Sequence, residues 1–370
     1  MSPTLVVILV GSCVAAACAL VGTFLVLRQM ALLGDAISHA VLPGIVIAFL
    51  LTGERAPLPM VLGAGALGVV TVFLVEAFHR SRRLKEDASI GVVFPALFSL
   101  GVVLITRFAN QVDLDLDCVL YGEIAYAPLD LLYFQGTSIG PKALWVNGAV
   151  LLANLLFVGL LYKELELTTF DAGLAASLGF SPLLVHYALM SMVSVTVVGA
   201  FESVGAILVV AMLVVPPATA YLLTDRLSVM LAASVVCGVL SAVAGYWLAY
   251  AFDASIAGAM AAVSGALFSL VLVLSPRHGL LARQLRQRTL GRGMAEQLLL
   301  LHLQAGGQPL SRDELAGRFS WRRARLEAVV QRVVVRGWAR RANGAIVITP
   351  RGESAIAERG AAPLRHREAT

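Results

Sequence analysis

Residues 5–27 read LVVILVGSCVAAACALVGTFLVL and decide the fold class of this chain, because the stretch is apolar and carries no charged side chain. A helix needs about 20 apolar residues to cross the hydrocarbon core of a bilayer, and this stretch is long enough. No Lys or Arg precedes it, so the basic region typical of a signal peptide is missing. We therefore expect a retained membrane-spanning helix here.

Uncharged runs of similar length recur at 36–53, 56–75, 88–106, 143–162, 203–224, 227–252 and 254–276, and the second half of 172–201 is a further candidate. Apolar residues make up 59% of the chain and charged residues 14%, against about 45–50% and about 25% in a soluble domain. We predict an all-α polytopic membrane protein with eight or nine transmembrane helices. Glycines at small-xxx-small spacing, such as those around Gly63, let such helices approach closely.

Charge divides the chain into two parts. Residues 1–276 carry a net charge of −6, and residues 277–370 carry a net charge of +11. Such asymmetry is typical of an apolar body joined to a basic domain. We therefore predict a transmembrane domain at 1–280, a basic linker at 281–293, a small domain at 294–359 and a disordered tail at 360–370.

The basic residues also predict the orientation of the body, since loops rich in Lys and Arg stay in the cytoplasm. Arg28, the run 79–85, Arg226 and the arginines of 277–288 all face the cytoplasm if the N-terminus is outside and nine helices cross. The loop 107–142 is then external, and its acidic residues are Asp113, Asp115, Asp117, Glu123 and Asp130. It is either an ordinary solvated loop or one whose negative charge concentrates cations near the membrane.

Two common hydrolase motifs are absent from the sequence. No Lys follows a Gly, so there is no Walker A loop to hold the phosphates of ATP, and the metalloprotease motif HExxH does not occur. We therefore do not expect this chain to be an enzyme or to carry its own ATPase site.

The strongest sign of chemistry is the segment GDAISHAVLPG at 34–44, which overlaps the second uncharged run. Asp35 and His39 are four residues apart, so a helix places them on one face about 6 Å from each other. His39 follows Arg28 by about 16 Å of helix, near the middle of the bilayer, where ionisable groups are costly and usually face a pathway. Carboxylate and imidazole together suit zinc, manganese or iron. The alternative is a buried pair that only holds two helices together.

Three segments carry a resemblance to a known family: RQMALLGDAISHAVLPG at 28–44, FDAGLAASLG at 170–179 and SVGAILVVAMLVVPPATA at 203–220. In this order they resemble the permease family of zinc, manganese and iron ABC importers, over roughly residues 1–280. The resemblance implies a multi-pass protein of the bacterial inner membrane that transports a divalent metal ion and holds no permanent cofactor. It also implies three partners: a second permease subunit, identical or different, a separate cytoplasmic ATPase and an external metal-binding protein.

The segment at 170–179 also predicts a local structure from its own residues. Asp171 can cap a short helix whose end is Gly179. The resemblance implies that this helix, with Asp171, Ala175 and Gly179, receives the movement of the ATPase. A re-entrant or merely connecting helix is the alternative.

Three further positions stand out in the apolar body. Glu202 lies between two apolar runs, where it either lines the translocation path or is an interfacial carboxylate at a helix break. Pro216-Pro217 removes two backbone donors, so we expect a broken or kinked helix that can line a transport cavity and can reduce the number of spans to eight. His186 is interpreted as a packed, hydrogen-bonded core histidine rather than a metal ligand.

The segment 294–359 predicts a separate domain, with a helix at Met294–Leu303, a capping box at Ser311–Glu314 and a helix from Ser320. Trp338–Arg341 and Ala345–Thr349 are predicted to form a hairpin whose turn is Asn343-Gly344. This order resembles a winged helix, a small α+β fold, which we place in the cytoplasm. Its arginines at 322, 323 and 325 can bind phosphates, lipid headgroups or an acidic protein. A regulatory protein contact is favoured, and nucleic acid binding is not.

These observations leave three classes of function. The favoured one is the permease subunit of an ABC importer for manganese, zinc or iron, which works by alternating access driven by a separate ATPase. A membrane-tethered, metal-responsive transcription regulator needs only one span. An intramembrane enzyme needs a nucleophile or an activated water besides Asp35 and His39. The sequence does not select among the three metals, because all of them accept carboxylate and imidazole.

Overall fold

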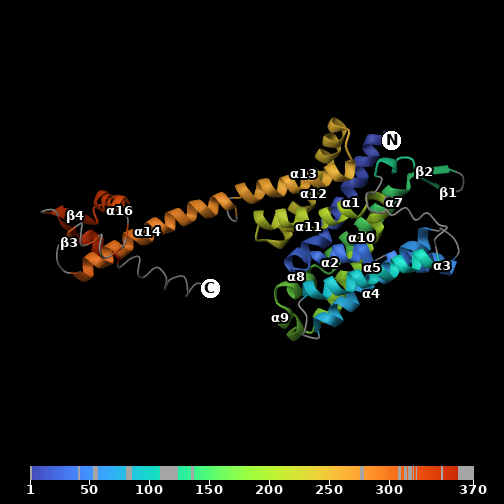
Figure 1. Cartoon of the computed structure of the whole chain (residues 1–370), viewed down its shortest axis with the longest axis horizontal. Helices are drawn as coiled ribbons and strands as arrows, with labels where there is room; N and C mark the ends of the chain where they lie inside the picture. Colours follow the sequence, from blue (N-terminus) through green and yellow to red (C-terminus); the bar gives the residue numbers. More distant parts are fainter. Residues whose placement is uncertain are drawn as a thin grey trace. The chain divides into compact units, whose positions relative to one another are not determined.

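A computed structural model of the chain describes residues 2–40, 42–52, 57–80, 86–108, 124–134, 137–275, 279–306, 310–311, 315, 319, 321, 323–342 and 345–356. For some residues inside helices, Glu202 among them, it describes the backbone alone. The chain separates into two compact units, 1–279 and 280–370 (Figure 1).

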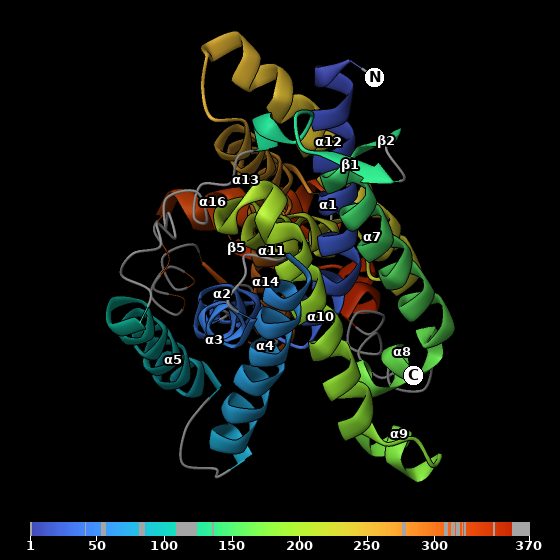
Figure 2. The same cartoon turned by 90° about the vertical axis from the view of Figure 1, so that its right-hand side faces the viewer.

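The first unit is a bundle of helices with one short β-hairpin (Figures 1 and 2). Its elements in chain order are α1 (Pro3–Leu27), α2 (Leu32–Ala40), α3 (Leu42–Thr52), α4 (Pro57–Arg80), α5 (Glu86–Phe108), η1 (Ile124–Tyr126), β1 (Leu131–Phe134), β2 (Thr137–Pro141), α7 (Lys142–Leu160), α8 (Tyr162–Phe170), α9 (Ala172–Ser177), α10 (Pro182–Val204), α11 (Ala206–Leu223), α12 (Leu227–Phe252) and α13 (Ile256–Leu274).

Most of the long helices are able to cross a membrane by length and composition. Among the described residues, eight stretches qualify, and one of them joins α2 and α3 into a single stretch, Leu32–Thr52. α4 contains a further, shorter apolar stretch at Leu62–Phe78. The predicted all-α polytopic fold is therefore confirmed. The candidate span in 172–201 is also a helix, since α10 begins at Pro182.

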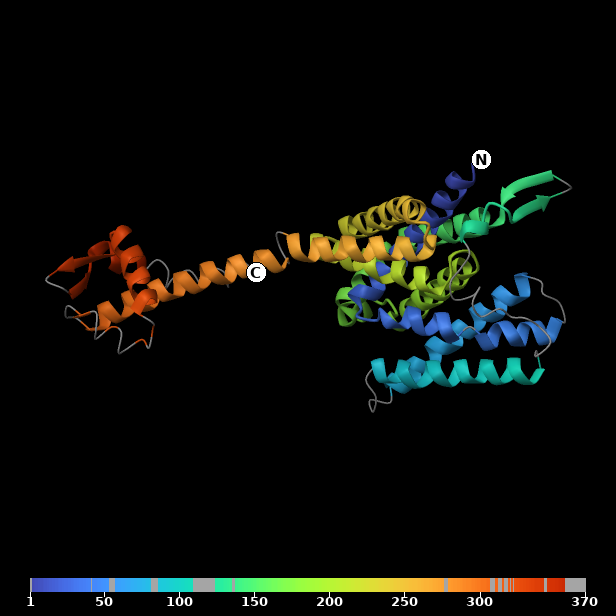
Figure 3. The same ribbon diagram turned by 45° about the horizontal axis from the view of Figure 1, so that its top comes forward.

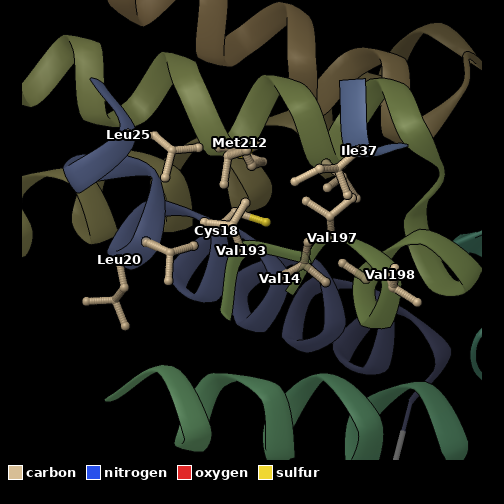
Figure 4. Packing of buried hydrophobic residues seen from close by; sticks show 14 of the residues in the cluster. Val14, Cys18, Leu20, Leu25, Ile37, Val193, Val197, Val198 and Met212 are labelled. Carbon is tan, nitrogen blue, oxygen red and sulfur yellow. The ribbon is translucent and has the colours of Figure 1, made fainter. Parts of the chain in front are cut away.

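α1 is buried along most of its length, as expected for a helix that is apolar on all sides. It contacts α7, α10, α11 and α12. Val14 and Cys18 of α1 share one hydrophobic cluster with Val193 of α10 and Met212 of α11 (Figure 4). The apolar stretch at residues 5–27 therefore supplies the central helix of the body.

α11 continues through Pro216 and Pro217, so the helix break expected at this pair is not present and does not lower the number of spans. Each proline leaves the carbonyl four residues earlier without its helical donor. One of these carbonyls belongs to Leu213, and it lies where a side chain on Gly22 of α1 would sit. The chain is instead interrupted at Gly205, whose φ of 77° separates α10 from α11.

The described part of the loop between α5 and α7 contains a β-hairpin. β1 and β2 pair antiparallel and project from the bundle beside α7 (Figure 3). The Oδ2 atom of Asp130 lies 4.0 Å from the Nζ atom of Lys142. The other acidic residues of this loop, Asp113, Asp115, Asp117 and Glu123, lie outside the described residues.

The second unit is small and mixed in structure. Its described elements are α14 (Leu280–Gly306), β3 (Leu310–Ser311), α16 (Arg323–Val335), β4 (Ala339–Ala342) and β5 (Ala345–Ile348). The three strands form an antiparallel sheet of order β3-β5-β4. Its core takes Leu299 and Leu303 from α14, Val329 and Val333 from α16, and Ile346 from β5. α16 thus lies within the helix predicted from Ser320, and the strands predicted for the hairpin are present.

Several other predictions for this unit fall partly outside the described residues. The segment 281–293, expected as a linker, is helical and belongs to α14, and residues 350–356 are also helical. Most of the capping box, the Asn343-Gly344 turn, the 360–370 tail and the side chains of the three arginines at 322, 323 and 325 lie outside the described residues. The winged-helix assignment stays a prediction.

Candidate functional site

Asp35 and His39 lie on one face of α2 as the sequence predicted. The Nε2 atom of His39 is 3.5 Å from the Oδ1 atom of Asp35, one helical turn away. The side chain of His39 is 29% exposed and that of Asp35 is 48% exposed in the single chain. The imidazole also faces two rings of α5, with centroid distances of 5.4 Å to Phe94 and 6.3 Å to Phe98.

The rest of α2 explains why this pair faces outward from its helix. The buried residues Leu33, Ala36, Ile37 and Ala40 follow the helical spacing of a single apolar face. On the same helix, Gly34 lies against the side chain of Leu213 in α11. The buried face anchors α2 in the bundle, and the partly exposed face carries the carboxylate and the imidazole.

The pair is an incomplete metal site by itself. Among the residues that the structure describes, no group of three or more His, Cys, Asp or Glu side chains is able to hold a metal ion. Glu202 lies in the last turn of α10, three residues before Gly205, but its side chain is not among those described. Its place in the translocation path therefore stays a prediction, and Asp35 with His39 offer two ligands.

The short helix expected at 170–179 is present as α9. The Oδ1 atom of Asp171 accepts a hydrogen bond of 2.8 Å from the backbone N–H of Leu174. At the other end Gly179 has a φ of 90°, and the N–H of Phe180 bonds the carbonyl of Ala175. Ala175 is fully buried against the neighbouring helices. The predicted caps are confirmed, and α9 lies with α8 at one end of α10 (Figure 2).

The structure adds a polar cluster that sequence reasoning missed. The Nε2 atom of His186 in α10 is 3.7 Å from the Oε2 atom of Glu76 in α4, and its Nδ1 atom is 3.5 Å from the guanidinium of Arg28. His186 is therefore hydrogen-bonded, as the sequence analysis predicted. Its partners belong to helices other than α10, which the sequence did not indicate. The only signal in the sequence is that each of these residues lies near a helix end on the side where the basic loops gather.

Comparison with known proteins places this geometry in a family. The ABC 3 transport family matches residues 2–275. MntD of Bacillus subtilis, a manganese transport system membrane protein, is 48% identical over 280 residues that cover 76% of this chain and 95% of the relative. TroD of Treponema pallidum, a zinc transport system membrane protein, is 42% identical over 357 residues that cover 95% of this chain and 97% of the relative.

A solved structure agrees with these sequence matches. PsaBC from Streptococcus pneumoniae, determined in complex with Fab, has a TM-score of 0.63 and 29% identity, and the match covers 75% of this chain and 94% of that one. None of these matches supports the alternative of a membrane-tethered transcription regulator. The match to the family extends through the membrane bundle, including the Asp35–His39 pair and α9, so the chain belongs to the ABC 3 transport family of ABC transporter permeases.

Proposed function

We propose that this chain is the membrane-spanning permease subunit of an importer that carries a divalent transition-metal ion, manganese, zinc or iron, into the cell. The single observation that carries the proposal is the Asp35–His39 pair within an apolar span. Carboxylate and imidazole are ligands that all three metals accept. The names of the manganese and zinc relatives point to the same class of cargo.

The exposure of the pair supports a second permease subunit. Asp35 is 48% exposed in the single chain, and a carboxylate that faces lipid within an apolar span is costly. A second permease subunit, packed over this face of α2, removes that cost. If it brings a similar pair, two chains together supply four ligands around one path.

The movement that opens and closes this path is proposed to come from a separate ATPase that binds at α9. Four large apolar side chains are exposed on or beside α9: Phe170, Leu174, Leu178 and Phe180. An apolar surface of this kind, next to an interfacial helix, suits a protein partner better than water. Binding and hydrolysis of ATP then drive alternating access, and Asp171, Ala175 and Gly179 maintain the shape of the contact.

We place α9 and the second unit in the cytoplasm and the β1–β2 hairpin outside, where an external metal-binding protein delivers the ion. This orientation follows the basic loops. The second unit is proposed to regulate transport through a protein contact. The alignment with MntD leaves about a quarter of this chain unmatched, whereas that with TroD extends over nearly all of it.

The proposal is tested with Asp35→Asn and His39→Gln in cells that express the whole transport system and no other importer for the metal. Each change should lower uptake at least about tenfold, because it removes one of two ligands, while the amount of protein in the membrane stays constant. Asp253→Asn is the matched control, because Asp253 is an exposed carboxylate at the end of α12. Competition among labelled manganese, zinc and iron identifies the cargo, and normal uptake by both variants would refute the proposed role of the pair.

A further inference from the structure

A network of polar side chains joins four helices at the end of the bundle that carries α9. Its centre is the guanidinium of Arg28, which directly follows α1. Arg28 donates a hydrogen bond of 2.9 Å to the hydroxyl of Thr168 and one of 3.1 Å to the hydroxyl of Thr169, both at the end of α8. The same guanidinium lies 3.5 Å from Nδ1 of His186 in α10, whose Nε2 faces Glu76 in α4 at 3.7 Å.

The donor and acceptor roles in this network follow from the side chains themselves. An arginine only donates, so Nδ1 of His186 is the acceptor, and a neutral ring then carries its proton on Nε2. This atom lies 3.7 Å from Oε2 of Glu76, within ion-pair range. The chain of contacts therefore runs cation, imidazole, carboxylate. His186 and Glu76 are only 15% and 18% exposed, so separating them without replacement partners is costly.

The two threonines of this network connect it to α9. Thr168 and Thr169 are the third and second residues before Asp171, which ends α8 and caps α9. A displacement of α9 by a bound partner therefore changes the geometry of the two hydroxyls around Arg28. Because hydrogen bonds weaken steeply with distance and angle, these contacts respond to a small displacement.

Glu76 and His186 connect the network to α2, the helix that carries Asp35 and His39. Glu76 and His186 lie about two turns along α4 and α10 from a tight crossing of these helices. At that crossing Gly68 of α4 packs on Ser194 of α10 and faces Ile37 of α2, and the hydroxyl of Ser194 bonds the carbonyl of Gly65. The crossing of α4 and α10 is therefore in direct contact with the helix that carries the pair.

We propose that Arg28, His186 and Glu76 are positioning residues that transmit the movement of α9 to the Asp35–His39 pair. The network does not bind the metal; it ties the α8–α9 segment to α4 and α10, and through them to α2. This inference rests on the proposed function, since it presumes that a partner at α9 drives transport of a metal held at α2.

The test uses the complete transporter, purified with its ATPase and second permease subunit and reconstituted in vesicles with its metal-binding protein. Manganese, zinc and ferrous iron are offered separately, and both metal uptake and ATP hydrolysis are measured. Glu76→Gln and His186→Gln should each lower the amount of metal moved per ATP hydrolysed by about tenfold, a typical size for coupling between sites. The double variant should be no worse than either single variant, because both changes break the same connection.

A merely structural role predicts a different outcome, in which less complex assembles but the ratio of metal to ATP is unchanged. An unchanged ratio in either assembled single variant, or a double variant whose losses multiply, would overturn the inference. Asp253→Asn, a carboxylate outside the network, should leave the ratio at the wild-type value. Failure of the wild-type complex to move any of the three metals would refute the proposed function itself, and this inference with it.

Discussion

Substitution of Gly63 by Ala tests how closely α3 and α4 must approach. A β-carbon on Gly63 would lie 2.5 Å from the carbonyl oxygen of Gly44 and 2.7 Å from the β-carbon of Ala48, both in α3. Ordinary van der Waals contact begins near 3.4 Å, so the two helices must separate by most of an ångström. Backbone and β-carbons are unable to rotate away, unlike the end of a long side chain.

The expected magnitude follows from two opposing effects. Adding a methyl group to a tightly packed contact costs about 1–3 kcal/mol, whereas replacing Gly by Ala in a helix interior gains up to about 1 kcal/mol. Gly65→Ala, two residues further along the same helix, is the matched control because nothing lies within 4 Å of its added β-carbon. The helix-propensity gain is common to both variants, so their difference reports the packing cost of about 1–3 kcal/mol.

Thermal inactivation of the purified full-length chain in detergent measures this difference. Both variants are heated at one rate, because unfolding of membrane proteins is commonly irreversible, and the remaining folded fraction is read by size-exclusion chromatography. In a reversible transition of a large domain this cost would correspond to about 2–12 °C, at about 2–4 °C per kcal/mol. Gly63→Ala should therefore lose its folded form at a lower temperature than Gly65→Ala at the same heating rate. Equal midpoints would show that α3 and α4 do not need the close approach that the structure describes.

Three further predictions concern α9 and the second unit. Asp171→Ala removes the acceptor for the N–H of Leu174, at a cost of about 1 kcal/mol to α9, and should lower metal uptake at equal protein abundance. Asp171→Asn keeps an acceptor and should not lower uptake. Equal uptake by the two variants would argue against a role for this cap. Glu296→Ala removes a carboxylate that is 2% exposed and paired with Arg332 and Arg336, so limited proteolysis of the full chain should cut the second unit faster, at a cost of about 2–3 kcal/mol. Glu327→Ala breaks only the exposed pair with Arg341 and should have little effect, and similar cutting of both variants would contradict this prediction. Truncation after Gly279, between the two units, should leave a permease that assembles and imports metal at an altered basal rate, since residues 2–275 already match the family. If the truncated chain assembles but moves no metal, the second unit is required for transport.

Local features of the site were accessible from the sequence because they depend on residues that are close in the chain. Helical spacing placed Asp35 and His39 on one face of α2, and the structure confirms their contact. Capping chemistry placed Asp171 and Gly179 at the ends of α9, which also agrees. Of the break or kink expected at Pro216-Pro217, the break is not present, because the intrinsic effect of proline on a helix is local, whereas α11 is held by packing against α1 and its other neighbours.

The amino-acid sequence already established that most of the chain lies in a membrane, because a bilayer requires about 20 apolar residues per helix. It also determined which residues begin and end α9, and which two side chains share a face of α2. By contrast, the meeting of Arg28, Glu76, Thr168 and His186 from four separate helices at one end of the bundle depends on the assembled fold. The physical reason is that lipid and protein interior are both apolar, so a uniformly apolar helix does not encode in its composition which face meets which neighbour. That choice is made by close packing of small residues such as Gly22, Gly63 and Gly68, and it exists only once the helices are assembled.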